Sequence, residues 1–485
     1  MTEPSKINFG KLAAERDDAL HSYFWESQSF LRLRDGERTV VLGNRGSGKS
    51  AIFRMIGDHA RNRNSLVIEL APEDYSYELL QQTLAAEKAG AWAKQGAYAA
   101  GWKYLIYVLI MKKLAESPGF KSGASAKIYS YLRDNHNNFD TNPIGVLISY
   151  VKRLEGIKLG DYQAGIKSVE LQKLYKLEEI VQLLPDLDKI TAKRNVVVLI
   201  DELDKGWDGS EDAVAFVAGL FQAALSINDR SENIRVLVSL RKELYDNIPA
   251  LYEDAQKVRD IIEEIEWEEP QLKSLIEKRI NASVDNVGED SWDSIFAETI
   301  DYRKSKSFNY VVDRTLYRPR EIIQFCTDIQ DVAVNSDKKC PLNYDVISEA
   351  EYPYSSERMK DIAAEYRFQF PGLLSVFETF RGGPYNFTLE GLEFHCLRIV
   401  TNELAVDESA KEWALETEPD EMITILWNVG FLRAQAVGGL RARQRSGSRY
   451  LGSHQISSLN LRSINRFHVH PMFRSSLGLK ETTAK

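Results

Sequence analysis

The sequence predicts an α/β fold in which a parallel sheet is covered by helices on both faces. Four short apolar runs carry this prediction, "ERTVVLG", "SLVIEL", "KRNVVVLIDELD" and "NIRVLVSLRKEL". They are rich in β-branched residues, as expected of strands buried on both faces. Helical stretches separate them, and strands that alternate with helices indicate a parallel sheet.

The chain has 485 residues, more than one hydrophobic core usually serves, so several domains are expected. We predict an N-terminal helical segment (1–36), an α/β core (37–73 and 191–268), a helical insertion (74–190), a helical lid (269–345) and a C-terminal winged-helix-like domain (346–485). The last prediction rests on helices followed by the hairpin-like "SSLNLRSINRFHVHPMF".

Two apolar patterns allow local predictions. In the first segment we expect a helix followed by a short extended piece, because one helical face collects Phe9, Leu12, Ala13, Leu20 and Phe24. In the insertion, an aromatic stripe is either an interface or, as we favour, core: Trp92, Tyr98, Trp102, Tyr104 and Tyr107. The uninterrupted run "YLIYVLIM" is too short to span a membrane and favours a buried helix.

Composition narrows the cellular setting. Three cysteines, Cys326, Cys340 and Cys396, show neither pairing nor metal-ligand spacing, which fits a reducing cytoplasm. The first residues lack the pattern of a signal peptide, so we expect a cytoplasmic protein without membrane partners. The net charge is −9, yet residues 430–485 carry ten basic residues and one acidic residue, which suggests an anionic partner for this tail.

A glycine-rich loop follows the first strand. Gly43, Gly48, Lys49 and Ser50 match G-x-x-x-x-G-K-[ST], a loop whose backbone N–H groups surround a β-phosphate. The lysine would contact the β- and γ-phosphates and the serine hydroxyl would ligate Mg²⁺. The strand before it and the helix after it argue against a chance match. The predicted nucleotide-binding set is Gly43, Asn44, Arg45, Gly46, Ser47, Gly48, Lys49, Ser50 and Ala51.

Two acidic residues end the strand "VVVLIDELD". Asp201 would complete the metal site with Ser50, and Glu202 would orient the attacking water. The alternative is that both merely end a strand as a helix cap. Because the phosphate-binding loop is already present, we favour catalysis.

Arginines are the remaining candidates for contacts with the nucleotide. The strand "IRVLVSL" should lie between the loop strand and the acidic strand, with Ser239 or Arg241 at its end. In "TLYRPREIIQF", Arg320 could reach the nucleotide from the lid, with Arg318 as the competing choice. A surface role is the alternative for each. Arg259 is the candidate for an arginine finger that acts on a neighbouring subunit.

Together these motifs resemble the AAA+ and STAND branches of P-loop ATPases. "FGKLAAERDDALHSYF" followed by "LRDGERTVVLGNRGSGKSAIF" looks more narrowly like bacterial P-loop ATPases related to KAP-type NTPases, found in antiphage defence loci. Asn44 departs from the arginine expected there, and Ser50 replaces the more usual threonine. The resemblance implies hydrolysis of Mg-ATP, a homo-oligomer and a conformational switch that acts with a separately encoded effector.

Two other functions remain open. A DNA-dependent ATPase, a loader or repair factor, would grip duplex phosphates through Arg441, Arg443, Arg445 and Arg449. A scaffold would bind nucleotide without turnover, against which Glu202 in the position of the catalytic base argues.

Overall fold

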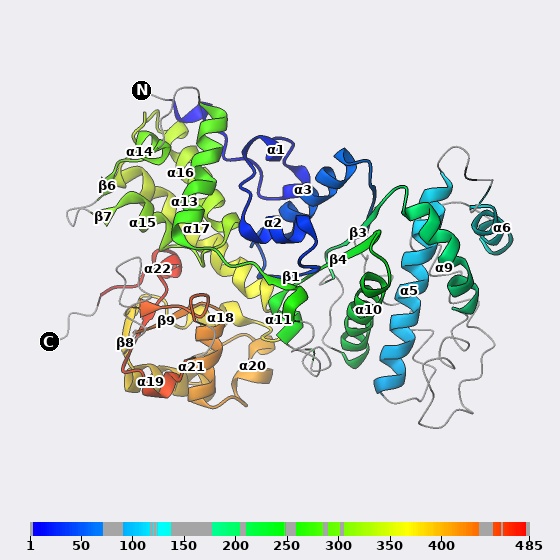
Figure 1. Ribbon diagram of the computed structural model, residues 1–485. Helices are drawn as coiled ribbons and strands as arrows, with labels where there is room; N and C mark the ends of the chain where they lie inside the picture. The colour runs from blue at the N-terminus through cyan, green and yellow to red at the C-terminus, as the bar shows by residue number, and fades with distance from the viewer. Residues whose placement is uncertain are drawn as a thin grey trace. The chain divides into compact units, whose positions relative to one another are not determined.

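The structure, a computed structural model, forms two compact units (Figure 1). One consists of Met1–Trp25, Arg45–Gly48 and Trp267–Lys485, and the other of Glu26–Asn44 and Lys49–Glu266. The described residues are 3–70, 91–116, 120, 123, 125–136, 177–203, 210–246, 248, 259–284, 290–300, 305–435, 450–456 and 459–481.

The second unit, called here the sheet unit, is built on a five-stranded parallel sheet of order β2-β3-β4-β1-β5. Its strands are β1 (Val40–Leu42), β2 (Leu66–Leu70), β3 (Val196–Ile200), β4 (Ile234–Leu240) and β5 (Ile262–Glu264). β4 pairs with β1 on one side and with β3 on the other. The predicted α/β fold, and the expected place of "IRVLVSL" between the other two strands, are confirmed.

Helices cover both faces of this sheet. α3 (Lys49–Asn62) packs against β2 and β3, and Leu199 of β3 lies beneath its Gly57. Val196, Val198 and Ile200 alternate to the other face and join the core formed with α10 (Glu211–Arg230). Because side chains in a strand alternate with period two, a strand buried on both faces must be apolar throughout, as "VVVLI" is.

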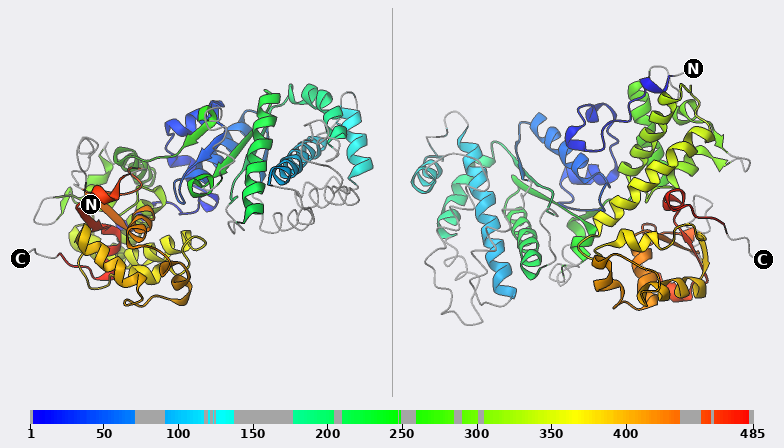
Figure 2. Two further views of the ribbon diagram at one scale, coloured as in Figure 1. Left: turned by 90° about the horizontal axis from the view of Figure 1, so that it is seen from below. Right: turned by 180° about the vertical axis from the view of Figure 1, so that it is seen from behind.

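The helical insertion contributes α5 (Ala91–Ala115), which lies beside α10 in both views of Figure 2. Tyr98, Trp102, Tyr104 and Tyr107 are buried, so the prediction of a core stripe is confirmed for these four; the side chain of Trp92 lies outside the described residues. Gly219 of α10 permits the close approach, since a Cβ there would lie 2.7 Å from Cβ of Tyr98.

Two further helices of the insertion are α6 (Ser125–Asn135) and α9 (Glu178–Thr191).

The run "YLIYVLIM" is buried within α5. In the parts of the chain that the structure describes, no helix combines the length and apolarity needed to cross a membrane.

The predicted N-terminal helix is wrong. Residues 8–27 contain only a short 3-10 turn (Ala14–Arg16) and α1 (Leu20–Tyr23), and the expected extended piece is helix α2 (Gln28–Asp35). The physical reason is a buried polar cluster: the Tyr23 hydroxyl donates to Asp17, and the Arg279 guanidinium donates to the carbonyl of Phe9 and lies 4.4 Å from the Tyr23 ring centre. Satisfying these groups bends the chain.

The first unit, called here the helical unit, continues with α13 (Glu269–Ser283), α14 (Ser291–Ile295), α15 (Ser307–Val312), α16 (Pro319–Asn335) and α17 (Tyr344–Glu365). A short hairpin of β6 (Thr299–Ile300) and β7 (Ser305–Lys306), which the sequence did not predict, interrupts them. These helices share one hydrophobic core with the C-terminal elements, from Leu272 to Leu477.

The C-terminal region is winged-helix-like, as predicted. α18 (Leu373–Glu378), β8 (Asn386–Thr388), α19 (Leu389–Val400), α20 (Glu408–Ala414) and α21 (Pro419–Asn428) precede β9 (Leu432–Gln435), β10 (Tyr450–Leu451), β11 (Arg466–Val469) and α22 (Pro471–Leu477). The sheet has the order β10-β9-β11-β8, and all of its pairs are antiparallel.

Candidate functional site

Within the sheet unit, the carboxyl ends of β1 and β3 bring the two sequence motifs together. The Ser50 hydroxyl, in the first turn of α3, donates a hydrogen bond to Oδ2 of Asp201 at 2.8 Å. The Asp201 backbone N–H donates to the Leu70 carbonyl at 3.0 Å, which holds this carboxylate at the end of β3. Residues 151 positions apart therefore share one edge of the sheet.

Lys49 lies at the end of the glycine-rich loop, at the first residue of α3. Its Nζ donates to the carbonyl of Gly43 at 2.6 Å and to that of Asn44 at 3.0 Å. A lysine ammonium has three donors and needs acceptors when it is partly buried. Phosphate oxygens are stronger acceptors than carbonyls because they are charged, so the ammonium is placed to exchange one set of acceptors for the other.

Glu202 has a backbone φ of 60°, in the left-handed region that glycine favours. Its N–H donates to Oδ1 of Asp201 at 2.9 Å, so one carboxylate orients both Ser50 and the backbone of Glu202. A non-glycine residue in this conformation costs about 1 kcal/mol or more, and such strain is concentrated at functional sites.

The centre of the loop, Arg45–Gly48, groups with the helical unit. Gly46 and Gly48 have φ values of 83° and 98°, which explains the need for glycine at both positions. The backbone N–H of Arg320 donates to the Gly46 carbonyl at 3.3 Å, and Nε1 of Trp267 donates to the Ser47 carbonyl at 2.8 Å. These two donors hold consecutive carbonyls of the loop.

Trp267 is a residue that the sequence analysis missed. It precedes Glu268, the N-cap residue of α13, which forms a capping box with Gln271, and its ring centre lies 5.6 Å from that of Trp25. The available signal was its position: an aromatic residue beside a helix-start pattern, at the end of the predicted α/β core. Sequence alone gives no reason to connect it with Ser47.

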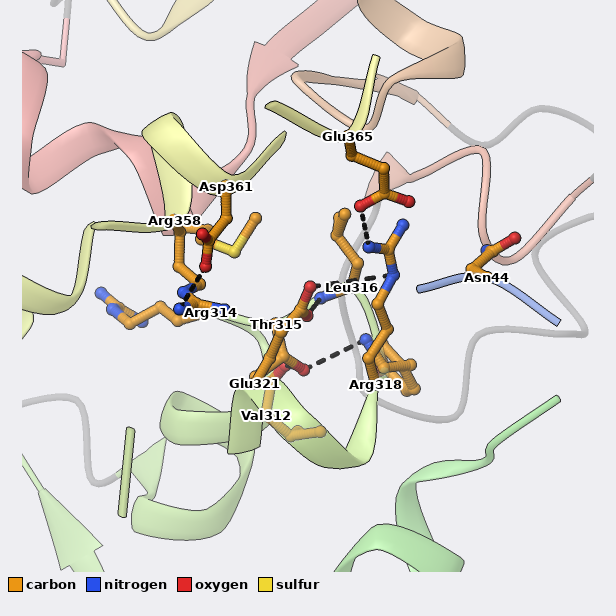
Figure 3. Close-up of polar contacts among 12 residues, drawn as sticks. Asn44, Val312, Arg314, Thr315, Leu316, Arg318, Glu321, Arg358, Asp361 and Glu365 are labelled. Atoms are coloured by element: carbon orange, nitrogen blue, oxygen red, sulfur yellow. Dashed lines mark hydrogen bonds and ion pairs between the residues drawn. The ribbon is translucent and has the colours of Figure 1, made fainter. Parts of the chain in front are cut away.

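The geometry separates Arg318 from Arg320. Arg318 is buried, its Nη1 donates to Oε2 of Glu365 at 2.7 Å, and its Nε lies 3.7 Å from Oε1 of Glu321 (Figure 3). The other oxygen of Glu321 accepts from the Leu316 N–H at 2.6 Å. Arg318 therefore serves to hold the turn that precedes α16.

Arg320 is the second residue of α16. Its Cβ would lie 3.1 Å from a Cβ added to Gly46. Burial, together with the charge of Arg45, lowers the pKa of its guanidinium. Among the described residues no carboxylate comes within ion-pair distance of it. A cation of this kind is suited to an anionic ligand.

The other predicted side chains lie at separate places. Ser239 is buried near the end of β4, and its hydroxyl has no hydrogen-bond partner among the described residues. Arg241 directly precedes α11 (Lys242–Asp246), and its carbonyl accepts from the N–H groups of Leu244 and Tyr245. Arg259 is exposed, just before β5. Their roles stay predictions.

The basic tail is not a uniform basic surface. Arg433 is 2% exposed and pairs with Asp313 at 2.6 Å. Arg474 donates to the Val469 carbonyl at 2.8 Å, and burial, followed by the charges of Arg433 and Arg314, lowers its pKa to about 10. The tail as counted from the sequence therefore includes two arginines of the fold itself. The four loop arginines 441, 443, 445 and 449 lie outside the described residues.

One family model and one curated protein are similar in sequence to this chain. Residues 270–363, from α13 into α17, match the family model of a FunZ-associated C-terminal helical domain. An 80.3 kDa protein of Escherichia coli K12, named for the transposon gamma-delta, is 23% identical over 490 residues, which cover 98% of this chain and 68% of that protein.

Solved structures of Aeropyrum pernix ORC2 are also similar. The ADPNP–ADP complexes are 11% identical, with 93% of this chain and 92% of the other covered, and the ADP form is 10% identical, with 98% and 95% covered. Each alignment has a TM-score of 0.32, too low to support an argument. The α/β fold stands on the strand order of the sheet itself.

Proposed function

We propose that this protein is a Mg²⁺-dependent ATP hydrolase. One observation carries the proposal: Ser50 and Asp201, from two distant motifs, meet at 2.8 Å at the edge of the sheet, with Lys49 in the loop beside Ser50 and Glu202 next to Asp201. A hydroxyl and a carboxylate are the ligands that Mg²⁺ takes from P-loop proteins, with phosphate oxygens and water completing its shell.

The residues present fit the cofactors. The Gly46 and Gly48 conformations open the loop backbone toward a phosphate, and the buried Ser47 hydroxyl has no partner among the described residues. When bound, Mg²⁺ would neutralise charge on the phosphates. In this proposal Lys49 releases the loop carbonyls to bind phosphate oxygens, Asp201 and Ser50 hold the metal, and Glu202 orients the attacking water. Arg320 and Arg241 bind the γ-phosphate side.

For the cellular role, the resemblance to ATPases of defence loci favours an oligomeric switch or motor that controls a separately encoded effector. A DNA-dependent ATPase is the second candidate, which the transposon-named relative keeps open. The solvent side of α21, however, carries Asp420, Glu421 and Thr424. The second helix of a helix-turn-helix motif reads DNA, and if α21 has that role its carboxylates repel phosphates. We therefore favour the switch.

The test compares ATP turnover of the wild type and Glu202→Gln, each with and without duplex DNA, and measures the mass of each by light scattering. Turnover by a defined oligomer that is lost in Glu202→Gln and indifferent to DNA supports the switch. Stimulation by DNA supports the second candidate. No Mg²⁺-dependent turnover in the wild type contradicts the enzyme. Phage plating with Lys49→Ala then tests the defence role, which unchanged protection would contradict.

A further inference from the structure

The C-terminal domain contains a pocket that the proposed ATPase site does not use. It has a volume of about 510 Å³ and lies between α19, α21 and the segment before β11. Leu389, Ile423 and Trp427 form part of its apolar lining, and Leu459 and Leu461 contribute from the opposite segment. All of these residues belong to the helical unit, so the pocket is a feature of one compact body.

The rim of this pocket is acidic. Glu393 comes from α19, Asp420 and Glu421 come from the first turn of α21, and Arg462 is the one basic residue of the lining. Arg462 already pairs with Asp420 at 2.7 Å. Acidic residues in a first turn suit the helix dipole, so Asp420 and Glu421 alone would need no further explanation. Glu393 lies in the middle of α19, where the dipole gives it no such role.

Two large apolar side chains of α19 are exposed, and one buried polar group of the pocket lining lacks a hydrogen bond. Phe394 and Leu397, on α19 beside and one turn beyond Glu393, are 62% and 43% exposed. Trp427 is 3% exposed, and its indole N–H has no hydrogen-bond partner among the described residues. Phe394 and Leu397 do not line the pocket but lie on α19, which contributes Leu389 and Glu393 to it. Exposed large apolar side chains on an element that also forms a pocket with a polar rim are typical of a protein-binding surface.

We propose that this pocket, with Phe394 and Leu397, binds an amphipathic helical segment of a partner protein that carries basic and apolar side chains. Basic side chains pair with Glu393 and Glu421, while apolar ones cover the partly exposed lining residues Leu389 and Leu459. An amphipathic helix laid into a groove between two helices is the recognition mode that this combination fits. The inference rests on the proposed function, because it gives chemistry to the partner of the switch.

Charge complementarity selects this occupant over nucleic acid. Three carboxylates face one guanidinium that is already paired, so a phosphate backbone would meet repulsion at the rim. A basic segment gains attraction from the same groups. The acidic balance also means that association should weaken as the salt concentration rises.

The experiment measures fluorescence anisotropy of a labelled amphipathic peptide of leucine and arginine against the full-length protein. The variants are Glu393→Gln with Glu421→Gln, and Phe394→Ala. The matched control is Glu412→Gln, an exposed carboxylate on α20 outside the pocket lining. We expect the double variant to weaken binding by about fivefold, the control to bind like the wild type, and a leucine–glutamate peptide not to bind.

Three results would overturn the inference. These are equal binding by the double variant and the control, equal binding of the glutamate peptide or of a labelled DNA duplex, and a wild-type dimer that Phe394→Ala converts to a monomer. The last result would assign the surface to a second copy of the chain. ATP turnover is measured on the same samples: turnover without peptide binding removes this inference and leaves the proposed enzyme intact.

Discussion

Two charged regions of the molecule differ in how their charges are satisfied. In the ion-pair cluster before α16, Arg318 pairs with Glu365 at 2.7 Å, Arg314 with Glu351 at 2.8 Å and Arg433 with Asp313 at 2.6 Å. At the glycine-rich loop, Nζ of Lys49 donates to the main-chain carbonyls of Gly43 and Asn44.

Arg318 and Arg320, two residues apart in the sequence, differ in the same way. Arg318 forms ion pairs with Glu365 and Glu321, whereas Arg320 has no ion pair among the residues that the structure describes. Paired buried charges hold a shape, because removing one leaves the other uncompensated. A buried cation that has no ion pair among the described residues, as Arg320, is suited to bind an anion. The two kinds should respond to substitution in opposite ways.

The largest effect is expected for Glu202→Gln. If Glu202 orients the attacking water, turnover should fall by about 10²- to 10⁴-fold, the usual contribution of a general base. ATP affinity and thermal stability should change little, because the amide keeps the volume of the carboxylate. Steady-state kinetics and nucleotide titration measure the two quantities, and a loss of turnover below about tenfold would remove Glu202 from the role of base.

The next prediction compares Arg318→Met with Arg320→Met. Arg318→Met leaves Glu365 buried and unpaired and should lower the free energy of unfolding by about 3–5 kcal/mol. Arg320→Met should change stability by less than about 0.5 kcal/mol and weaken ATP binding or turnover instead. Urea denaturation and kinetics measure both. The reverse pattern would show that we have exchanged the structural and the functional arginine.

A smaller effect is expected for Trp267→Phe, which keeps an aromatic ring and removes the hydrogen bond to Ser47. The loss of about 1 kcal/mol should weaken ATP binding by roughly fivefold. Trp413→Phe is the matched control, because its indole donates to the Pro371 carbonyl at the same 2.8 Å within the C-terminal region. Equal nucleotide affinity of both variants would argue against a role of Trp267 in positioning the loop.

The last prediction concerns the pH dependence of stability. Burial, together with the charge of Arg398, lowers the pKa of His395 to about 4 in the folded protein. The unfolded chain, with a histidine pKa near 6.5, binds more protons between these values, so stability should fall as pH decreases from about 6.5 to 4. His395→Gln should flatten this dependence of the unfolding midpoint. An equally steep dependence in the variant would assign it to other groups.

Several features could be predicted from the sequence because they depend on local chemistry. The strand "VVVLI" is apolar throughout and "IRVLVSL" is interrupted only by Arg235 and Ser239, because both faces of the sheet are covered, and this pattern predicts strands of a parallel sheet. The loop needs glycine where φ is positive, so Gly46 and Gly48 mark it. The winged-helix-like C-terminal region followed from its order of helices and hairpin.

Other features depend on distant partners. The helix predicted near Phe9 fails because Arg279, 270 residues away, takes the Phe9 carbonyl and bends the chain. The spacing of apolar residues predicts which face of a segment is buried. It does not predict which polar side chain from elsewhere in the chain will bind to the backbone of that segment. The count of basic residues in 430–485 fails for the same reason. Arg433 was counted as a surface charge, but in the fold it pairs with Asp313.

The sequence by itself determined the parallel sheet, the glycine-rich loop and the acidic end of β3, because each depends on the chemistry of one short run of residues. Only the tertiary structure decided which arginine is paired, that Trp267 holds the loop at Ser47, and that an acidic pocket opens beside α21. These depend on which charges and donors meet across the fold. That is a property of three-dimensional packing, and no single stretch of the chain carries it.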